Sequence, residues 1–306
     1  MVRMKLSGLN ALVAALEEGS LRGAARRLGV SQPAMTKALR ELEREVSAPL
    51  LQRSTTGVTA TAQGQVLYEH ACTVNRELAS AMQTIGQLGG QMVGELKVGA
   101  VPLAMLLLIP ETMRTFSQAF PDIQLHLREE LYVAQLTLLR GGEVDVVLGP
   151  IPEGLPHGEL HVEPLLPIEM AVVVGKNSPL RNCRSLPELQ QARWVFTSAT
   201  GASSYAKLLF QQHGLTPPTP KAIVNSTLGL MALIAGGDCV GLMPMPIALH
   251  PAARDFMEVV PIREGHLSLK LGAMFRPETL LKPVIRHFLS HLHRSAHQAR
   301  ALQTLL

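Results

Sequence analysis

The sequence has few cysteines, few aromatic residues and no long apolar run, and each shortage excludes a class of protein. Its three cysteines, Cys72, Cys183 and Cys239, form no CxxC pair, so neither a disulfide framework nor a thiolate zinc site is expected. Aromatic residues make up 4% of the chain, which argues against single-strand binding by base stacking. The apolar run at 103–110 is too short for a bilayer, and the N-terminus lacks an apolar signal segment, so we expect a cytoplasmic protein without a membrane partner.

Sequence motifs of catalysis are also missing. The GxSxG elbow is absent because Gly201-Ala202-Ser203 lacks the closing glycine, and no GxxxxGK phosphate loop occurs. His287 and His291 have the spacing of metal ligands on a helix, but no Glu follows His287, and we interpret the pair as part of a solvated helix face. We therefore expect no enzymatic activity, no metal site and no cofactor.

The positive charge of the chain is concentrated near its start. Residues 1–61 carry nine Lys and Arg against five Asp and Glu, whereas residues 62–306 carry nineteen of each kind. A single arginine is more often part of a solvated helix face, but a concentrated surplus attracts a polyanion through counterion release. The distribution indicates duplex DNA as the partner of the N-terminal fifth of the chain.

Residues 20–46 have the pattern of two short amphipathic helices separated by a turn at Gly29. Ser20 and Ser31 are the candidate N-caps, and apolar residues recur at helical spacing after each of them. Such a pair of helices can lay the second one in the major groove of DNA. The residues that we expect to contact bases or phosphates here are Arg22, Ser31, Gln32, Pro33, Thr36, Lys37 and Arg40.

A hairpin and a long helix follow this pair. Residues 49–59 predict a β-hairpin, a wing from which Arg53 and Thr55 would touch the flanking backbone or the minor groove. From residue 62 to 90 a proline-free helix has apolar residues spaced alternately by four and three, which predicts a seam for a second copy of the chain. The alternative is a helix that lies on its own domain. The seam consists of Leu67, Ala71, Val74, Leu78, Ala81, Ile85 and Leu88.

After residue 94 apolar runs of strand length alternate with amphipathic stretches of helical length. This pattern is typical of an α/β region with largely parallel sheets, and it is long enough for two sub-domains. We place sub-domain I at about 91–166 and 268–306, sub-domain II at about 167–267, and a small molecule in the cleft between them. The strands are expected at 96–101, 123–127, 144–148, 170–174, 194–196, 222–224, 240–243 and 267–275.

We expect the small molecule where strand ends meet helix starts, because free N–H groups and hydroxyls there can hold a polar or anionic head. Val101 and Leu103 would form an apolar wall, which favours a hydrophobic body such as an aromatic ring. Ser203 and Ser226 could alternatively serve only as N-caps. The expected binding residues are Val101, Pro102, Leu103, Gly149, Pro150, Ser198, Thr200, Ser203, Asn225 and Ser226.

The order and spacing of several motifs resemble the LysR-type transcriptional regulators along essentially the whole chain. The motifs include Ser31-Gln32-Pro33-Ala34, Pro49-Leu50-Leu51-Gln52-Arg53, Thr61-Ala62-Gln63-Gly64, Leu139-Arg140-Gly141-Gly142-Glu143-Val144-Asp145 and Ile234-Ala235-Gly236-Gly237. Two positions depart from the pattern. The chain has Ala100-Val101-Pro102-Leu103 where the family often carries an effector-binding Ser or Thr, and Pro150 where members that take acids often have Arg.

The resemblance implies an α/β protein with an N-terminal all-α winged helix-turn-helix. The DNA-binding domain would span residues 1–61, a dimerising linker helix 62–90, and an effector-binding domain 91–306. The last of these would consist of two Rossmann-like sub-domains resembling a type 2 periplasmic binding protein. The family usually assembles as a homotetramer, a dimer of dimers, and an activator would also contact RNA polymerase.

The sequence therefore predicts a transcriptional regulator that binds promoter DNA sequence-specifically and is controlled by a small-molecule effector. By analogy the effector would be an aromatic or other organic acid. The alternative is a small-molecule binding module without DNA-binding activity, which would show no salt-dependent affinity for duplex DNA. The positive N-terminus argues against that alternative.

Overall fold

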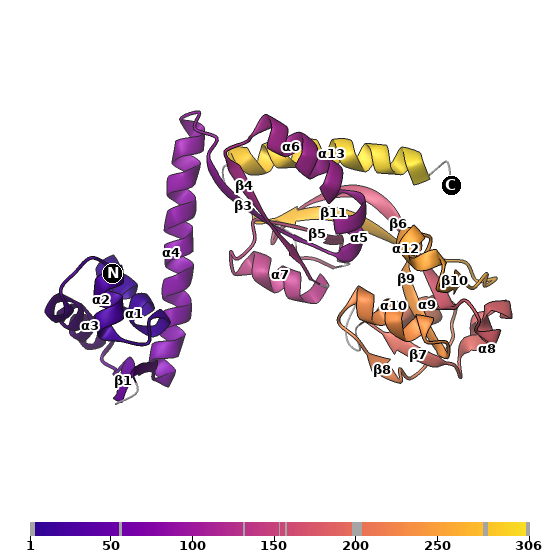
Figure 1. The fold of residues 1–306 in the computed structure, drawn as a ribbon, viewed down its shortest axis with the longest axis horizontal. Helices are drawn as coiled ribbons and strands as arrows, with labels where there is room; N and C mark the ends of the chain where they lie inside the picture. The colour runs from indigo at the N-terminus through magenta and orange to yellow at the C-terminus, as the bar shows by residue number, and fades with distance from the viewer. Residues whose placement is uncertain are drawn as a thin grey trace. The chain divides into compact units, whose positions relative to one another are not determined.

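The computed structural model describes residues 4–54, 57–130, 132–152, 154–156, 158–197, 204–277 and 281–303. The chain divides into two compact units, Met1–Ile85 and Gly86–Leu306 (Figure 1). Within the described ranges, no helix is long and apolar enough to cross a membrane.

The first unit begins with three helices, α1 (Leu6–Glu17), α2 (Leu21–Arg27) and α3 (Gln32–Val46). Both predicted N-caps are confirmed: Ser20 Oγ accepts a hydrogen bond from the Gly23 N–H at 3.1 Å, and Ser31 Oγ accepts one from the Ala34 N–H at 3.3 Å. Gly29 has a φ of 65°, the left-handed conformation that the turn between α2 and α3 requires. The core that holds the helices together includes Leu12, Ala24, Met35, Leu39, Leu42 and Leu50.

A hairpin and most of a long helix complete the first unit. Strands β1 (Leu51–Ser54) and β2 (Gly57–Ala60) pair antiparallel, as the wing prediction requires, and α4 spans Ala62–Leu88. The first turn of α4 is tied to the chain just before the hairpin. The Thr61 N–H donates to the Leu50 carbonyl at 3.0 Å, and Thr61 Oγ1 donates to the Pro49 carbonyl at 2.7 Å. The wing and the long helix therefore share one anchor point.

One nine-stranded sheet runs through the second unit, in the order β4-β3-β5-β11-β6-β9-β7-β8 with β10 added beside β6. The expectation of largely parallel sheets is wrong, because four of the eight pairings among the described strands are antiparallel. The difference comes from β6 and β11, which pair antiparallel with each other in the middle of the sheet. The strands are β3 (Gly94–Ala100), β4 (Ile123–Glu129), β5 (Val146–Pro150), β6 (His161–Gly175), β7 (Arg193–Phe196), β8 (Ala222–Ile223), β9 (Cys239–Pro244), β10 (Met257–Val259) and β11 (Leu267–Phe275).

Residues 166–167, where we placed a sub-domain boundary, lie inside β6, and residues 267–268 lie at the start of β11. The register joins these two points, since Leu267 pairs with Met170 and Leu271 pairs with Leu166. The chain thus passes between the two halves of the sheet along paired strands.

Helices cover both faces of this sheet. Around the β3–β5 half, α6 and α13 lie side by side over one face and α7 lies on the other (Figure 1). The core includes the fully buried rings of Phe116, Phe288, Trp194, Phe196 and Phe210. The helices are α5 (Pro102–Leu107), α6 (Ile109–Ala119), α7 (Tyr132–Arg140), α8 (Leu186–Leu189), α9 (Tyr205–Gln212), α10 (Thr227–Ala235), α11 (Met245–Ala248), α12 (Pro251–Arg254) and α13 (Pro283–Gln303), with a 3-10 turn at Pro179–Asn182.

Candidate functional site

Helix α3 has one buried and one exposed side. Met35, Leu39 and Leu42 are each 1% exposed and pack into the core of the first unit. The opposite side carries most of the residues that the sequence predicted to contact DNA. Ser31, Gln32, Pro33, Lys37 and Arg40 are exposed, and Thr36 is half-buried. The helix therefore presents hydrogen-bonding and cationic side chains to solvent from its first two turns onward.

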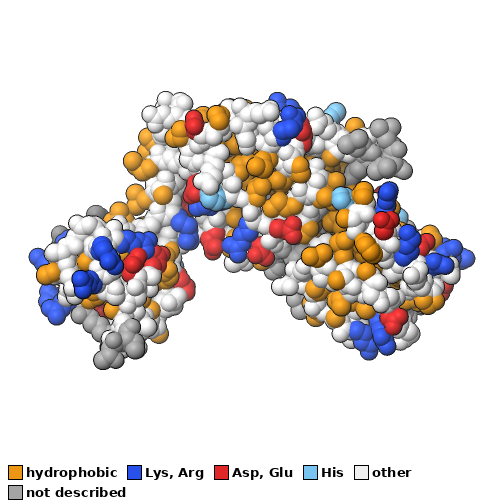
Figure 2. Space-filling view, viewed as in Figure 1, with side chains coloured by type: hydrophobic (Ala, Val, Ile, Leu, Met, Phe, Trp, Pro, Cys, Tyr) orange, Lys and Arg blue, Asp and Glu red, His pale blue; other side chains and the backbone are white. Residues whose placement is uncertain are grey.

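The Lys and Arg side chains of the first unit differ in whether they form ion pairs with acidic side chains. Arg27 forms ion pairs with Glu17 and Glu18, which fix it at the corner between α1 and α2. Lys37 lies 4.0 Å from Glu41 Oε1, at the limit of an ion pair, and its side chain is 80% exposed. Arg22 and Arg40 are exposed, and neither is ion-paired with any residue that the structure describes. Figure 2 shows exposed Lys and Arg side chains on the surface of this unit.

The predicted wing residues are only partly described. The backbone of Arg53 pairs with Val58 in the hairpin, but its side chain and the whole of Thr55 lie outside the described residues.

The predicted seam on α4 divides into two parts. Ala71 is buried in the core of its own unit and the half-buried Leu67 packs against that core, as in the alternative of a helix that lies on its own domain. The hydrophobic side chains further along remain exposed because no core of their own unit covers them. They are Val74, Leu78, Ala81, Ile85 and Leu88, joined by Met82 at 67% exposure.

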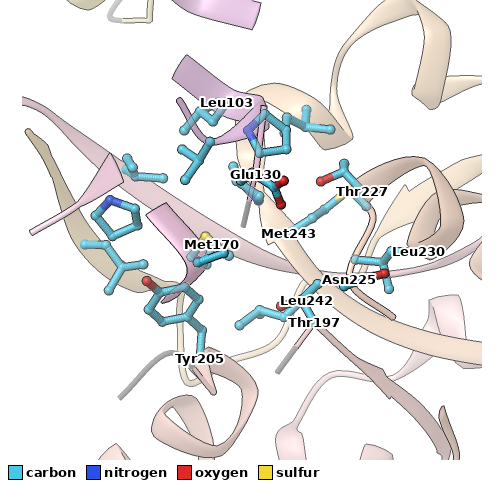
Figure 3. Close-up of a pocket in the computed structure, with 18 of the residues that line it drawn as sticks. Leu103, Glu130, Met170, Thr197, Tyr205, Asn225, Thr227, Leu230, Leu242 and Met243 are labelled. Carbon is cyan, nitrogen blue, oxygen red and sulfur yellow. The ribbon is translucent and has the colours of Figure 1, made fainter. Parts of the chain in front are cut away.

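The second unit contains a pocket of about 450 Å³ (Figure 3). Its walls come from the ends of β4, β5, β7 and β9, from β6 and β11, and from five helices. The apolar lining residues are Val101, Pro102, Leu103, Ala134, Pro150, Ile168, Met170, Leu230, Leu242, Met243, Pro244, Ile247 and Leu269. The polar lining residues are Glu130, Thr137, Thr197, Tyr205, Asn225 and Thr227.

Half of the predicted binding residues line this pocket, namely Val101, Pro102, Leu103, Pro150 and Asn225. Two other predicted residues are not among those that line it. Gly149 is buried in β5 opposite Gly272 rather than at the pocket surface, and Ser226 Oγ caps α10 by accepting from the Gly229 N–H at 3.2 Å. Three other predicted residues, Ser198, Thr200 and Ser203, lie outside the described residues.

Sequence reasoning missed most of the polar lining. Glu130 and Thr197 directly follow strands β4 and β7, so the rule that ligands bind at strand ends could have found them. Thr227 is the neighbour of the predicted Ser226. The lining residues of β6 and β11, such as Met170 and Leu269, carry no local signal because only the pairing of those strands brings them to the pocket.

Glu130 is held in place by its backbone. Its N–H donates to the Ala100 carbonyl at 3.3 Å, and its carbonyl accepts from Gln135 Nε2 at 2.6 Å. Its carboxylate Oε1 accepts from the Arg128 guanidinium at 3.4 Å. Glu130 is thus the one charged group among the described lining residues, and its main chain is fixed on both sides.

Tyr205 begins α9 at the pocket wall. Burial raises the pKa of its phenol above the ordinary value, so the hydroxyl is neutral at physiological pH and can donate a hydrogen bond. The preceding Ser204 is 4% exposed, and its Oγ has no hydrogen-bond partner in the described part of the chain. Ser204 lies beside the pocket with Thr197 and Tyr205. This corner offers hydroxyl groups rather than charge.

The sequence also showed two histidines at the spacing of metal ligands, and the described ranges give their surroundings. No group of three or more His, Cys, Asp or Glu is placed there to hold a metal ion. His291, one of the two histidines at metal-like spacing, is bonded through Nδ1 to Thr115 Oγ1 at 2.9 Å and packs edge-on against Phe116. The interpretation of His287 and His291 as a solvated face is wrong for His291, which is 9% exposed because it faces α6.

Both units match known protein families. Residues 6–65 match the family described as bacterial regulatory helix-turn-helix protein, lysR family, and residues 89–296 match the LysR substrate binding domain. The chain is 31% identical over 283 residues to the DNA-binding transcriptional dual regulator OxyR of Escherichia coli, covering 91% of this chain and 92% of OxyR. It is 28% identical over 311 residues to the regulator TfdS of Cupriavidus pinatubonensis, covering 96% and 100%.

Solved structures show the same fold. The crystal structure of CbnR, a LysR family transcriptional regulator, superposes with a TM-score of 0.69 at 21% identity, covering 96% of this chain and 99% of CbnR. CbnR in complex with its target DNA gives a TM-score of 0.68. At this identity the likeness concerns the fold alone.

Proposed function

The chain belongs to the LysR family of transcriptional regulators, and from this we propose that α3 reads promoter DNA while the pocket of the second unit binds the controlling effector. Members of the family are regulators with a helix-turn-helix DNA-binding domain and an effector-binding domain, not enzymes. The observation that carries the DNA proposal is the two-sided α3. Its apolar side is buried in the core of the first unit, and the polar side of its N-terminal part is exposed to solvent.

Each exposed side chain on α3 has a specific proposed role. Gln32 stands at the helix start and has the bidentate geometry that reads adenine in the major groove. Thr36 lies about one turn further on the same side, and Lys37 and Arg40 are long enough to reach guanine edges or phosphates. Arg22, Ser31 and Pro33 flank this surface and would contact the sugar-phosphate backbone of the DNA, which fixes the position of the helix on the duplex. Arg53 and Thr55 of the wing would do the same.

The test is a selection of binding sites from randomised duplexes, followed by affinity measurements at several salt concentrations. Gln32→Ala should lose about 1–3 kcal/mol of discrimination at one base pair, because a bidentate base contact is removed. Arg40→Ala should lower the salt slope by about one, because one released counterion is lost. Arg193→Ala is the matched control. It removes an equal charge from an exposed site in the second unit, where Arg193 pairs with Asp238.

Unchanged base preference in Gln32→Ala, together with an unchanged salt slope in Arg40→Ala, would rule out α3 as the reading helix. An equal loss in Arg193→Ala would show that only the net charge of the chain matters. Absence of any salt-dependent affinity for duplexes in the wild type would favour a binding module without DNA-binding activity.

The proposal that the pocket holds the effector rests on its shape and lining. A cavity of about 450 Å³ with mostly apolar walls and a few convergent polar groups is typical of small-molecule sites. Ala134 is an exposed lining residue on α7, so Ala134→Trp should fill the pocket at little cost in stability. A thermal-shift screen of metabolites should yield ligands that lose binding in Ala134→Trp and keep it in the exposed control Ala252→Trp. Equal binding in both variants would place the effector elsewhere.

We also propose how copies of the chain assemble and act. The exposed apolar residues of α4 from Val74 to Leu88 would pack against a second copy and form a dimer, and two dimers would form a tetramer. An activator would in addition contact RNA polymerase. A regulator of this kind acts on the chromosome, so we propose the cytoplasm as its location.

A further inference from the structure

We propose that the effector of this protein carries a positively charged nitrogen on an apolar body. The inference rests on the proposed function of the pocket and deepens it by assigning the charge of the ligand. It departs from the organic acid that the sequence suggested by analogy.

The first step is the inventory of charge around the pocket. Glu130 is the single charged side chain among its described lining residues, and no Lys, Arg or His contributes to the walls. Residues 198–203 follow Thr197 in the sequence and lie outside the described ranges; they read Ser-Ala-Thr-Gly-Ala-Ser and include no charged residue. A carboxylate ligand would therefore meet a like charge, and none of the described lining residues would offer it a cationic side chain.

The second step is the placement of the Glu130 carboxylate. Figure 3 shows it pointing into the space between Leu103, Thr227 and Met243. Its Oε1 is 3.4 Å from the Arg128 guanidinium, a long contact between side chains that are 39% and 52% exposed. Such surface pairs are weak. Oε2 has no hydrogen-bond partner among the residues that the structure describes, so one oxygen is available to a ligand.

The third step is the rigidity of the main chain at Glu130. The main chain of Glu130 is bonded to Ala100 and to the fully buried Gln135. A main chain that is already fixed loses little freedom when a ligand binds, which increases the affinity that each contact of the residue yields. The surrounding walls are apolar, and charged contacts are stronger where water is displaced.

The helix N-termini near the pocket favour anions, but less strongly. The start of α10 offers about half a positive charge, and its Gly229 N–H is already taken by Ser226 Oγ. Helix α5 begins with Pro102, which has no N–H to donate. Helix α9 begins at Tyr205 without a side-chain cap and adds a further partial positive charge. Each of these partial charges is smaller than the full negative charge of the Glu130 carboxylate. The hydroxyl and amide groups of Thr197, Tyr205 and Asn225 would hold an uncharged polar part of the ligand.

The test uses three probes that share one aromatic body: 2-phenylethylamine, 2-phenylethanol and phenylacetate. Their affinities for the full chain are measured at neutral pH by ligand-observed NMR and calorimetry. We expect the amine to bind at least about tenfold more tightly than phenylacetate. Glu130→Gln should reduce the affinity of the amine to that of the alcohol, because only the amine uses the charge.

Glu143→Gln is the matched control. Glu143 lies 3.8 Å from the same Arg128, is 48% exposed and does not line the pocket. This variant removes an equal charge from the same neighbourhood and should leave the order of the three probes unchanged. A similar loss of amine affinity in both variants would mean that the general field, rather than a contact with Glu130, selects the cation, and would overturn the proposal.

Phenylacetate binding as tightly as the amine, or failure of the amine to bind at millimolar concentration, would also overturn it. These outcomes are separable from failure of the proposed function. If phenylacetate binds the wild type and Ala134→Trp excludes it, the pocket is still the effector site and only the assigned charge is wrong. If a ligand binds equally well to Ala134→Trp, the pocket assignment itself fails.

Discussion

Replacing Gly64 by alanine should destabilise the first unit, which carries the helix-turn-helix, while leaving the stability of the second unit unchanged. Gly64 lies in the first turn of α4, directly against the chain that enters the wing. An alanine Cβ at this position would lie 1.9 Å from the carbonyl oxygen of Leu50, whereas real Cβ contacts are almost never shorter than 3.0 Å. The two backbones must therefore move apart by more than 1 Å.

Neither backbone can move freely. The Leu50 N–H donates to Glu43 Oε1 at 2.9 Å, and its carbonyl accepts from the Thr61 N–H at 3.0 Å. The Gly64 N–H in turn donates to Thr61 Oγ1 at 2.9 Å. We expect a cost of about 3 kcal/mol, at the upper end of overpacking penalties, because the opposing atom is backbone. The better helix propensity of alanine offsets about 1 kcal/mol.

The net loss of about 2 kcal/mol should lower the Tm of the first unit by about 10 °C, given its size. Hydrogen exchange of α1–α3 in the full chain measures this loss directly. The chain has one tryptophan, Trp194, which is fully buried in the second unit. Its fluorescence should therefore show that the unfolding transition of the second unit is the same as in the wild type. The affinity of the chain for duplex DNA should fall in proportion to the fraction of molecules in which the first unit is folded.

Gly86→Ala is the matched control in the last turns of the same helix. A Cβ there would meet only Gln91 Oε1 at 3.7 Å, an ordinary contact, so this variant should be neutral or more stable by up to about 1 kcal/mol. If Gly64→Ala proves as stable as Gly86→Ala, the close approach to Leu50 is not a real constraint and the reasoning is refuted.

Three further changes test other parts of the molecule. Leu78→Lys puts a charge into the exposed apolar stripe of α4 and should dissociate the dimer in sedimentation experiments; an unchanged assembly would exclude the stripe as its interface. Asp145→Asn breaks the ion pair in which the Asp145 carboxylate lies 3.0 Å from the ammonium of the 9%-exposed Lys282, and should lower the free energy of unfolding of the second unit by about 3 kcal/mol in urea titrations; a loss below about 1 kcal/mol would contradict this. Burial, with a smaller contribution from Arg294, lowers the pKa of His291 from its usual 6.5, so the folded state favours the neutral ring. The free energy of unfolding should accordingly fall as the pH drops below about 6.5, and His291→Gln should remove that part of the pH dependence.

The first unit was predictable from the sequence almost to the residue, because its signals are local. A cap such as Ser20 or Ser31 bonds to an N–H three residues away, so the few residues that decide each helix start are adjacent in the chain. The same holds for the turn at Gly29 and for the hairpin. The seam on α4 was predicted less well, because periodicity shows an apolar side but not what covers it. The structure assigns Ala71 to the core of its own unit.

The pocket was only partly predictable. Residues at strand ends, such as Val101, Pro150 and Asn225, follow from the general rule for α/β sheets. Ser226 and Gly149 do not line the pocket, since the Ser226 hydroxyl caps a helix and Gly149 is covered by its neighbours in a central strand. The carboxylate at Glu130 did not stand out among the many acidic residues of the sequence.

The sequence by itself determined the three helices and wing of the reading unit, the concentration of positive charge there, and the family. These properties depend on neighbouring residues, on composition, or on motifs whose order can be read along the chain. The tertiary structure alone decided why position 64 must be glycine, which side of α4 stays open, and which charged residue lines the pocket. These depend on the approach of Leu50 to α4 and on the antiparallel register of β6 with β11, which brings segments about a hundred residues apart to one wall.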